Sequence, residues 1–449
     1  MASTVLDSEI FGDIFGSAEM RAIFSDENTV ACYVRAEVAL AVAQGKVGVI
    51  PSEHADAIAA KAPQVVLDRA ELRKEAENVG YPILGLVRQL SAALGDAGRY
   101  VHWGATTQDI MDTAVVLQVR DGLALVERDL GAVATALQAL AVKHRDTAMA
   151  GRTHLQQALP ITFGYKAAIW LSMVERHLIR LKQLRERVLV AQLGGAAGTL
   201  ASLGDAGLDV RREYAAALEL AEPDITWHVA RDGLVEAVQV LGLITGSLGK
   251  VGFDIMLMMA TELGEAFEPF AEHRGASSTM PQKRNPISSE VLVANAKAVR
   301  QHAGLMLDAM LQDFERATGP WQAEWIALPE SFILAAGALR QARFMLEGLV
   351  VDAERMRANL DLTKGLIVAE AVMMGLAPHF GRQEAHDRVY AACRLALAQN
   401  RPLYEVLAGD SGITAVLGTD HLRRLCDPEN YVGAAAAMVD AVVARRGKS

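Results

Sequence analysis

The longest regular pattern in the chain is a row of apolar residues between positions 116 and 140. Eight of them recur at alternating spacings of three and four residues: Val116, Val119, Leu123, Val126, Leu130, Val133, Leu137 and Leu140. This spacing is typical of a coiled-coil seam, in which one stripe of a helix packs against neighbouring helices. It predicts a helix of about 30 residues from Asp112 onwards, about 45 Å in length.

Four further segments have the apolar content and length of long helices. One follows Pro160 and continues past Arg187, and the others are Asp232–Glu268, Pro286–Leu311 and Leu328–Leu349. No strand-like alternation of any length appears. Five helices of this size predict an all-α, elongated bundle whose connecting segments carry the chemistry.

Length and composition bound the number of domains. At 449 residues the chain is long enough for two or three domains, and its 51% hydrophobic content excludes a disordered protein. A boundary is expected near residue 110, where the long seam begins, and another near residue 365, after which the helices become shorter. We therefore predict three mostly helical domains, residues 1–110, 111–365 and 366–449.

Charge and cysteine content exclude several function classes. A net charge of −10 leaves no basic excess for a nucleic-acid partner, and three cysteines are too few for a disulfide framework or a zinc cluster. The segment Met1–Ser17 contains acids and no apolar core, so it does not resemble a secretory signal. The apolar tract Leu234–Phe270 is interrupted by charged residues, which argues against a membrane span. We expect a cytoplasmic protein without membrane partners.

The segment Ala276–Pro286, A-S-S-T-M-P-Q-K-R-N-P, concentrates reactive groups in one loop. It holds two adjacent hydroxyls, an ammonium group, a guanidinium group and an amide. Hydroxyl oxygens cannot balance this positive charge, so the loop is predicted to bind an anion. A bound polycarboxylate, with Ser277 or Ser278 placed to take a proton from carbon, satisfies this requirement.

A simpler interpretation is a surface turn followed by a helix. Asn285 would then be the N-cap, Pro286 the first helical residue and Glu290 an acid in the first turn. This interpretation leaves the serine pair, Met280 and Lys283 unexplained.

The loop resembles the signature S-S-x-M-P-x-K-x-N of the fumarase/aspartase superfamily. The matching positions are Ser277, Ser278, Met280, Pro281, Lys283 and Asn285. Val101–Thr113 (V-H-W-G-A-T-T-Q-D-I-M-D-T) and Gly151–Pro160 (G-R-T-H-L-Q-Q-A-L-P) resemble the first and second signatures of two branches of this superfamily. These branches are the adenylosuccinate lyases and the 3-carboxy-cis,cis-muconate cycloisomerases. One position departs from the pattern, because Ala276 replaces the usual glycine and Gly275 stands one residue earlier.

The resemblance covers effectively the whole chain and implies an assembly. Superfamily members are homotetramers whose central helices form a 20-helix core, with active sites assembled from three subunits. The first signature would then lie in the N-terminal domain, and the second and third in the central long-helix domain.

The resemblance also implies catalytic roles. Ser277 corresponds to the base and Ser278 to its hydrogen-bonding neighbour. A serine is a base only if its alkoxide is favoured, which backbone amides of the loop and Lys283 would do. Histidine suits the acid that protonates the leaving group, and both His154 and His102 are candidates. Glu290 would pair with His154, raise its pKa and keep it charged.

Further signature residues are expected to bind a small anionic polycarboxylate. Thr106, Thr107 and Asp109 supply hydroxyls and an orienting acid where the first long helix begins, although Asp109 or Asp112 would also suit a plain N-cap. Arg316 offers a bidentate carboxylate contact. The remaining candidates are Thr153, Gln156, Ser278, Met280, Lys283 and Asn285. No metal or cofactor is expected, since no histidine has ligand partners at suitable spacing and no dinucleotide fingerprint is present.

Three functions remain. The first is a cofactor-independent lyase that breaks a carbon–nitrogen, or carbon–oxygen, bond β to a carboxylate through an aci-carboxylate and releases fumarate or a relative. The second is 3-carboxymuconate cycloisomerisation, an intramolecular addition through the same kind of intermediate. The third is an inactive helical scaffold. His154 favours the first, because a departing amine needs a proton, whereas the similarity along the whole chain favours the second.

Overall fold

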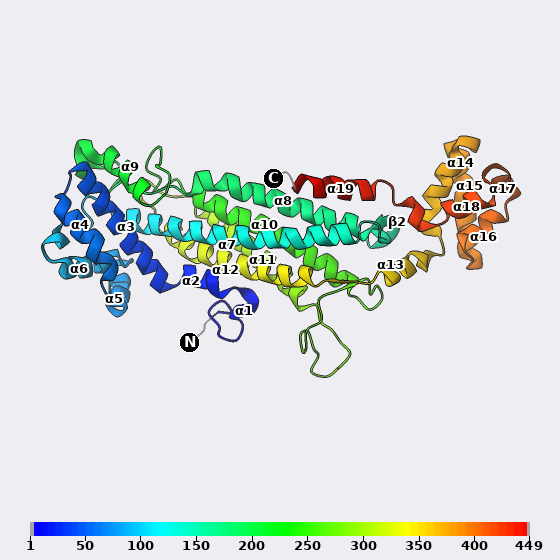
Figure 1. Cartoon of the computed structure of the whole chain (residues 1–449), viewed down its shortest axis with the longest axis horizontal. Helices are drawn as coiled ribbons and strands as arrows, with labels where there is room; N and C mark the ends of the chain where they lie inside the picture. The colour runs from blue at the N-terminus through cyan, green and yellow to red at the C-terminus, as the bar shows by residue number, and fades with distance from the viewer. Residues whose placement is uncertain (1–3, 447–449) are drawn as a thin grey trace. The chain divides into compact units, whose positions relative to one another are not determined.

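The computed structural model describes residues 4–446 and is built almost entirely of helices, which confirms the all-α prediction (Figure 1). All eight seam residues are buried. They lie on the longest helix, which begins five residues before the predicted start. The long helices are α7 (Thr107–Lys143), α8 (Phe163–Val188), α10 (Asp232–Met258), α11 (Ile287–Asp308) and α12 (Pro320–Glu347).

Shorter helices precede, interrupt and follow the long ones. Before α7 lie α1 (Gly12–Phe15), α2 (Ala18–Ile23), α3 (Asp26–Val47), α4 (Ser52–Lys61), α5 (Arg69–Val79) and α6 (Ile83–Leu94), and α9 (Gly207–Ala217) follows α8. The C-terminal part contains α13 (Ala353–Leu360), α14 (Ala369–Phe380), α15 (Arg382–Gln399), α16 (Leu403–Ala408), α17 (Ser411–Leu417), α18 (Thr419–Leu425) and α19 (Ala435–Arg446). Short 3-10 helices cover Ala62–Gln64, Gly95–Tyr100, Ala201–Ala206, Asp361–Thr363, Leu366–Val368 and Pro428–Tyr431.

Two predicted helix boundaries are wrong by eight residues or more. α10 ends at Met258 rather than Glu268, and turns follow it, in which the Gly264 N–H donates to the Ala260 carbonyl and the Glu265 N–H to the Met258 carbonyl. α12 begins at Pro320 rather than Leu328. Pro329, one residue after the predicted start, lies inside this helix. Pro320 occupies the first helical position, where proline is favoured because that N–H has no intrahelical acceptor.

Two pairs of short strands lie among the helices, although the sequence shows no strand-like alternation. β1 (Ala148–Thr153) and β2 (Gln156–Thr162) form an antiparallel hairpin, with Arg152 opposite Gln157 and an irregularity between Ala150 and Arg152. This irregularity and the short length remove the apolar–polar alternation by which strands are found in sequences. A second pair, β3 (Ala266–Phe267) with β4 (Val350–Val351), is also antiparallel.

The chain groups into two compact units, and the division passes through the long helices. The first comprises Met1–Leu130, His177–Leu248 and Ala294–Arg340, and the second comprises Gly131–Arg176, Gly249–Val293 and Gln341–Ser449. Side chains tie neighbouring helices within each unit. In the first, Asn295 donates to the carbonyl of Leu334 at 2.9 Å, and in the second the Trp170 indole N–H donates to Asp254 at 3.2 Å. The division into three domains remains a prediction.

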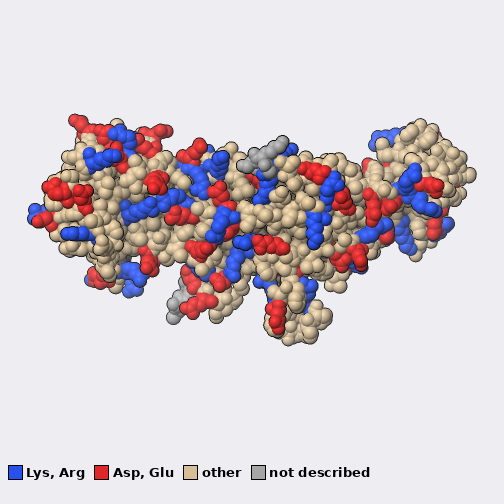
Figure 2. All heavy atoms as spheres, viewed as in Figure 1, with Lys and Arg blue, Asp and Glu red and all other residues tan. Residues whose placement is uncertain are grey.

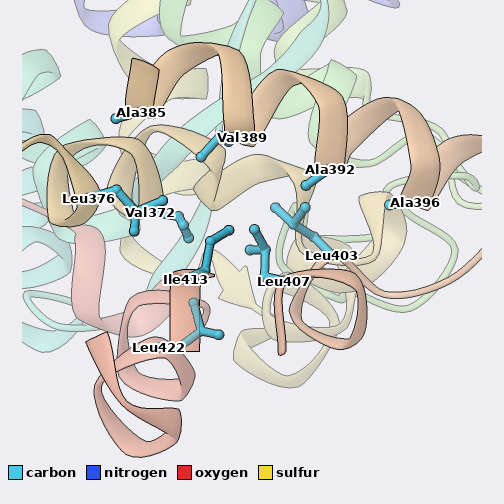
Figure 3. Close-up of a cluster of buried hydrophobic side chains, with 10 residues drawn as sticks. All are labelled: Val372, Leu376, Ala385, Val389, Ala392, Ala396, Leu403, Leu407, Ile413 and Leu422. Carbon is cyan, nitrogen blue, oxygen red and sulfur yellow. The ribbon is translucent and has the colours of Figure 1, made fainter. Parts of the chain in front are cut away.

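The C-terminal helices of the second unit have a hydrophobic core of their own (Figure 3). Its side chains point toward one another from α14 to α18. They are Val372, Leu376, Ala385, Val389, Ala392, Ala396, Leu403, Leu407, Ile413 and Leu422.

Helix α10 is the one described helix that is long and apolar enough to cross a membrane by length and composition. Half of its most apolar window is buried inside the protein, as expected of a core helix. On the face seen in Figure 2, basic and acidic side chains are interspersed over the helices. An anion site on that face would therefore depend on local groups.

Candidate active site

The third signature forms a loop that closes on itself at its base. The Asn285 N–H donates to the Gly275 carbonyl at 2.9 Å, and Ala276 bridges to Arg284. Gly275 has a φ of +69°, and a Cβ at this position would lie 2.5 Å from the Asn285 oxygen. Only glycine meets both conditions. The glycine that stands one residue early in the sequence is therefore the residue that allows the loop to close.

Side chains on both arms hold the base of the loop. Arg274 donates to the Ser288 hydroxyl at 2.6 Å and to the Gln341 side-chain oxygen at 2.7 Å. Arg284 donates to the Glu268 carbonyl at 3.0 Å and lies 5.6 Å from the centre of the Phe270 ring. In the structure this side chain anchors the loop.

The start of α11 is capped from outside the helix. The buried carboxylate of Glu268 accepts hydrogen bonds from the Ser288 N–H at 3.1 Å and the Ser289 N–H at 2.7 Å, close to the positive end of the helix dipole. The helix begins at Ile287, one residue after Pro286, so the prediction of Pro286 as the first helical residue is wrong. The N-cap role predicted for Asn285 is filled by Glu268, which lies too far away in sequence to be recognised. Glu290 lies in the first turn, as predicted.

The tip of the loop carries the serine pair. The Ser277 hydroxyl oxygen accepts hydrogen bonds from the Met280 N–H at 3.0 Å and the Thr279 N–H at 3.3 Å. Ser277 is half-buried, whereas Ser278, Met280 and Lys283 are exposed. Donors directed at a hydroxyl oxygen stabilise its deprotonated form more than its neutral form. The geometry therefore lowers the energetic cost of a Ser277 alkoxide.

The second signature lies at the tip of the β1–β2 hairpin. His154 and Leu155 are the two turn residues, and both have positive φ, 51° and 63°. Two-residue hairpin turns of this kind usually use glycine or asparagine, so a histidine here costs conformational energy. Thr153, His154 and Gln156 are all exposed. Within residues 4–446 of one chain, no hydrogen bond or ion pair joins His154 to Glu290.

The base of the hairpin is fixed by a buried ion pair. Arg152 makes two parallel hydrogen bonds to Glu265, at 2.8 and 2.6 Å, and the Glu265 side chain is fully buried. Asn359 donates to the same carboxylate at 2.8 Å, and Gln157 donates to the Asn359 carbonyl at 2.7 Å. The turn that carries His154 is therefore exposed while the strands beneath it are held.

The first signature begins α7 and is organised by Asp109. Its fully buried carboxylate accepts hydrogen bonds from the Thr106, Gly194 and Gly195 N–H groups, each at 2.9 Å, and contacts His228 Nε2 at 2.7 Å. Asp109 is the third residue of the helix, and its bond to Thr106 is one half of a capping box. The alternative that Asp109 or Asp112 is a plain N-cap is thus wrong. Asp109 orients the loop, as the sequence suggested.

Asp112 belongs to a buried ionic cluster in the first unit. Arg231 donates to Asp112 at 2.7 and 2.9 Å and to Glu324 at 2.8 Å, and the Trp321 indole N–H donates to Asp112 at 3.1 Å. The cluster lines a cavity of about 330 Å³ together with Trp325. Both tryptophans therefore wall this cavity.

His102 contacts a carboxylate that sequence reasoning missed. Its Nδ1 lies 2.6 Å from Glu37 Oε1, and Glu37 is buried on α3. Burial alone would lower the pKa of His102, but the charge and hydrogen bond of Glu37, together with the charge of Asp109, outweigh it and raise the pKa. The signal that could have identified Glu37 is its position as a charged residue within an otherwise apolar stretch of α3.

The predicted site residues fall into two groups. The first unit contains His102, Thr106, Thr107, Asp109 and Arg316, whose guanidinium donates to the Ala196 carbonyl at 2.9 Å. The second unit contains Thr153, His154, Gln156, Ser277, Ser278, Met280, Lys283, Asn285 and Glu290. Sequence reasoning missed His228 and the two glycine N–H groups that hold Asp109, because these residues lie outside the three signatures.

Comparison with known proteins links these loops to one group of enzymes. The family model described as "Lyase" matches residues 15–300, and the model for the adenylosuccinate lyase C-terminus matches residues 365–442. A 3-carboxy-cis,cis-muconate cycloisomerase from Pseudomonas aeruginosa is 47% identical over 98% of this chain and 97% of its own. An N-acetyl-S-(2-succino)cysteine lyase from Dickeya dadantii is 42% identical over 99% of this chain and 98% of its own. A crystal structure of a fumarate lyase from Mesorhizobium sp. BNC1 is 56% identical, with a TM-score of 0.91 over 96% of this chain and 98% of that one.

Proposed function

Because the chain belongs to the lyase family of the fumarase/aspartase superfamily, we propose that it catalyses β-elimination from a succinyl-type polycarboxylate, releasing fumarate or a relative. The observation that carries the proposal is the Ser277 hydroxyl. Two backbone N–H groups donate to its oxygen, on an exposed loop that also bears Lys283. An ordinary serine turn also makes these two hydrogen bonds, but it does not require the nearby Lys283. A base that attacks a C–H bond requires both, because the developing charge must be stabilised.

The reaction begins with removal of a weakly acidic hydrogen. Ser277 takes the proton from the carbon next to a carboxylate, and the electron pair spreads over that carboxylate as an aci-carboxylate. Lys283 and Asn285 are placed on the same loop to stabilise the added negative charge, which is the largest single requirement of such a reaction. The intermediate then expels the group on the neighbouring carbon and forms a double bond.

The leaving group needs a proton if it departs as an amine or alcohol. His154, on the exposed hairpin tip, supplies it, with Glu290 keeping the imidazole charged. In a single chain these two side chains form no described contact, so the proposed pair joins different subunits of a homotetramer. Thr106, Thr107, Thr153, Gln156 and Arg316 bind the carboxylates.

The names of two relatives indicate the substrate class. 3-carboxymuconate and N-acetyl-S-(2-succino)cysteine each carry three carboxylates. We infer that this enzyme also acts on a tricarboxylate, with carbon–sulfur cleavage added to the carbon–nitrogen and carbon–oxygen bonds considered above. The second candidate is lactonisation of 3-carboxymuconate, favoured by the high identity to a cycloisomerase. Lactonisation starts from an alkene and releases no group. It therefore does not require His154 as the acid for a leaving group.

A substrate panel separates the two candidates. The purified protein is incubated with adenylosuccinate, argininosuccinate, N-acetyl-S-(2-succino)cysteine and 3-carboxymuconate, and the ultraviolet absorbance of fumarate or the formation of lactone is recorded. We expect fumarate from a succinyl compound. Lactone from 3-carboxymuconate, with no fumarate from any succinyl compound, would establish the cycloisomerase instead.

Ser277→Ala tests the base, with Ser278→Ala as the matched control. Loss of a general base lowers kcat by about 10²- to 10⁴-fold, and the KM should change little because the cationic groups remain. Ser278→Ala should retain more activity than Ser277→Ala. Full turnover by Ser277→Ala would refute the assignment.

A further inference from the structure

Helix α3 presents two buried polar side chains to the first signature. Glu37 and Gln44 are seven residues apart, so they lie two turns apart on the same face of the helix. Their exposed fractions are 2% and 0%. Gln44 Nε2 donates to the Trp103 carbonyl at 2.6 Å, and Glu37 Oε1 lies 2.6 Å from His102 Nδ1. The helix therefore fixes two consecutive residues of the signature loop.

The geometry determines which end of His102 is available. Nδ1 faces a carboxylate, which only accepts hydrogen bonds, so Nδ1 carries a hydrogen. Nε2 is the remaining ring nitrogen, on a side chain that is 19% exposed whereas that of Glu37 is 1% exposed. His102 also has a φ of +62°, a backbone conformation that is unfavourable for histidine. The buried contacts of α3 hold the residue there.

We propose that Glu37 is a positioning residue that keeps His102 as an imidazolium and directs its Nε2–H toward a carboxylate of the substrate. His102 then serves as a fixed cation for binding, which leaves proton donation to His154. The inference rests on the proposed function in one respect, that the substrate is a polycarboxylate. It adds two residues, Glu37 and Gln44, that lie outside the three signatures.

The charged groups around His102 support a protonated ring. Glu37 faces it from α3, and Asp109 acts on it from the start of α7. Asp109 also contacts His228, and the neutral phenol of Tyr214 on α9 lies within the influence of both carboxylates. The two nearby charges are negative. Since the pKa of His102 is raised, its positive charge is complete at low pH and is lost as pH rises through that raised value.

The first test measures the protonation of His102 without any substrate. Diethyl pyrocarbonate reacts with the neutral imidazole, so peptide mass spectrometry of labelled His102 over a pH series gives the midpoint of its titration. Glu37→Gln keeps a hydrogen-bond acceptor of the same shape but removes the charge. We expect its midpoint to fall, because a close opposite charge is lost. Glu27→Gln, at an exposed position on the same helix, should leave it unchanged.

The second test measures the consequence for binding. At a pH between the two labelling midpoints, the Glu37→Gln variant should raise the KM by about 10-fold, as when a charge-assisted hydrogen bond is lost, with kcat within about 2-fold of the wild type. The alkaline fall of kcat/KM should move to lower pH. Glu37→Asp, which keeps the charge, should recover part of both effects, and it replaces the glutamine variant if that variant does not fold.

Each result decides the proposal. An unchanged labelling midpoint in Glu37→Gln would overturn it, and so would a fall in kcat at constant KM, which would make His102 the proton donor. A shifted midpoint with a raised KM would support it. A shifted midpoint with no turnover of any compound in the panel would support the role of Glu37 and count against the proposed function alone.

Discussion

Replacing Asp109 by asparagine should destabilise the protein strongly, although the two side chains have the same shape. The carboxylate accepts from the Gly194 N–H and contacts His228 through Oδ1, and it accepts from the Thr106 and Gly195 N–H groups through Oδ2. An asparagine has one oxygen, so its amide group must face one of these two pairs of donors. In the less costly orientation Nδ2 takes the place of Oδ1, and the His228 ring changes tautomer so that Nε2 accepts from it. The Gly194 N–H and the second Nδ2 hydrogen are then two buried donors without an acceptor.

The size of the effect follows from the number of donors left without a partner. Each unsatisfied buried donor costs about 1–3 kcal/mol, so Asp109→Asn should lower the free energy of unfolding by about 2–6 kcal/mol. Asp109→Ala leaves all four donors unpaired and should cost more. Domains are stable by only about 5–15 kcal/mol, so either change removes a large share of the total.

Urea denaturation followed by circular dichroism measures this difference. Protein concentration must be equal in all samples, because assembly contributes to apparent stability. Asp205→Asn, an exposed position in the same unit, is the matched control and should change the free energy of unfolding by less than about 0.5 kcal/mol. If Asp109→Asn is as stable as this control, the four contacts do not hold the start of α7.

Two further changes test the loops of the second unit. Arg152→Met should lower the free energy of unfolding by about 3–5 kcal/mol, because it leaves the buried Glu265 charge without its partner, and adding Glu265→Met should recover part of the loss. A double variant less stable than the single one in thermal unfolding would refute this. Gly275→Ala places a Cβ 2.5 Å from the Asn285 oxygen, so it should reduce kcat/KM by at least about 10-fold with little change in melting temperature. Full activity in this variant would show that loop closure does not position Ser277.

The sequence predicted the helical fold because the period of the apolar residues is a local property. The seam of α7 needs only its own side chains to be recognised, and all eight proved buried. The β1–β2 hairpin escaped prediction because its short, irregular strands lack alternation and its turn uses His154 and Leu155 in place of glycine or asparagine.

The reactive residues of the site could be recognised in the sequence, but the buried carboxylates that hold the surrounding segments could not. Ser277 and His154 stand in recognisable patterns of neighbouring residues. Glu37, Glu265 and Glu268 act on segments that lie 65, 113 and 20 residues away. A contact across such a distance depends on the packing of whole helices, which leaves no trace in local spacing. Polar residues in otherwise apolar helical segments were the available hint.

The most direct test of the account is the fate of the C–H bond that Ser277 is proposed to break. A substrate found in the panel is incubated in deuterium oxide, and its C–H cleavage is followed by proton NMR in the wild type and in Ser277→Ala. We predict that cleavage occurs in the wild type and is lost in the variant while calorimetry still detects substrate binding. If Ser277→Ala cleaves the bond at the wild-type rate, another group is the base and the central claim is wrong.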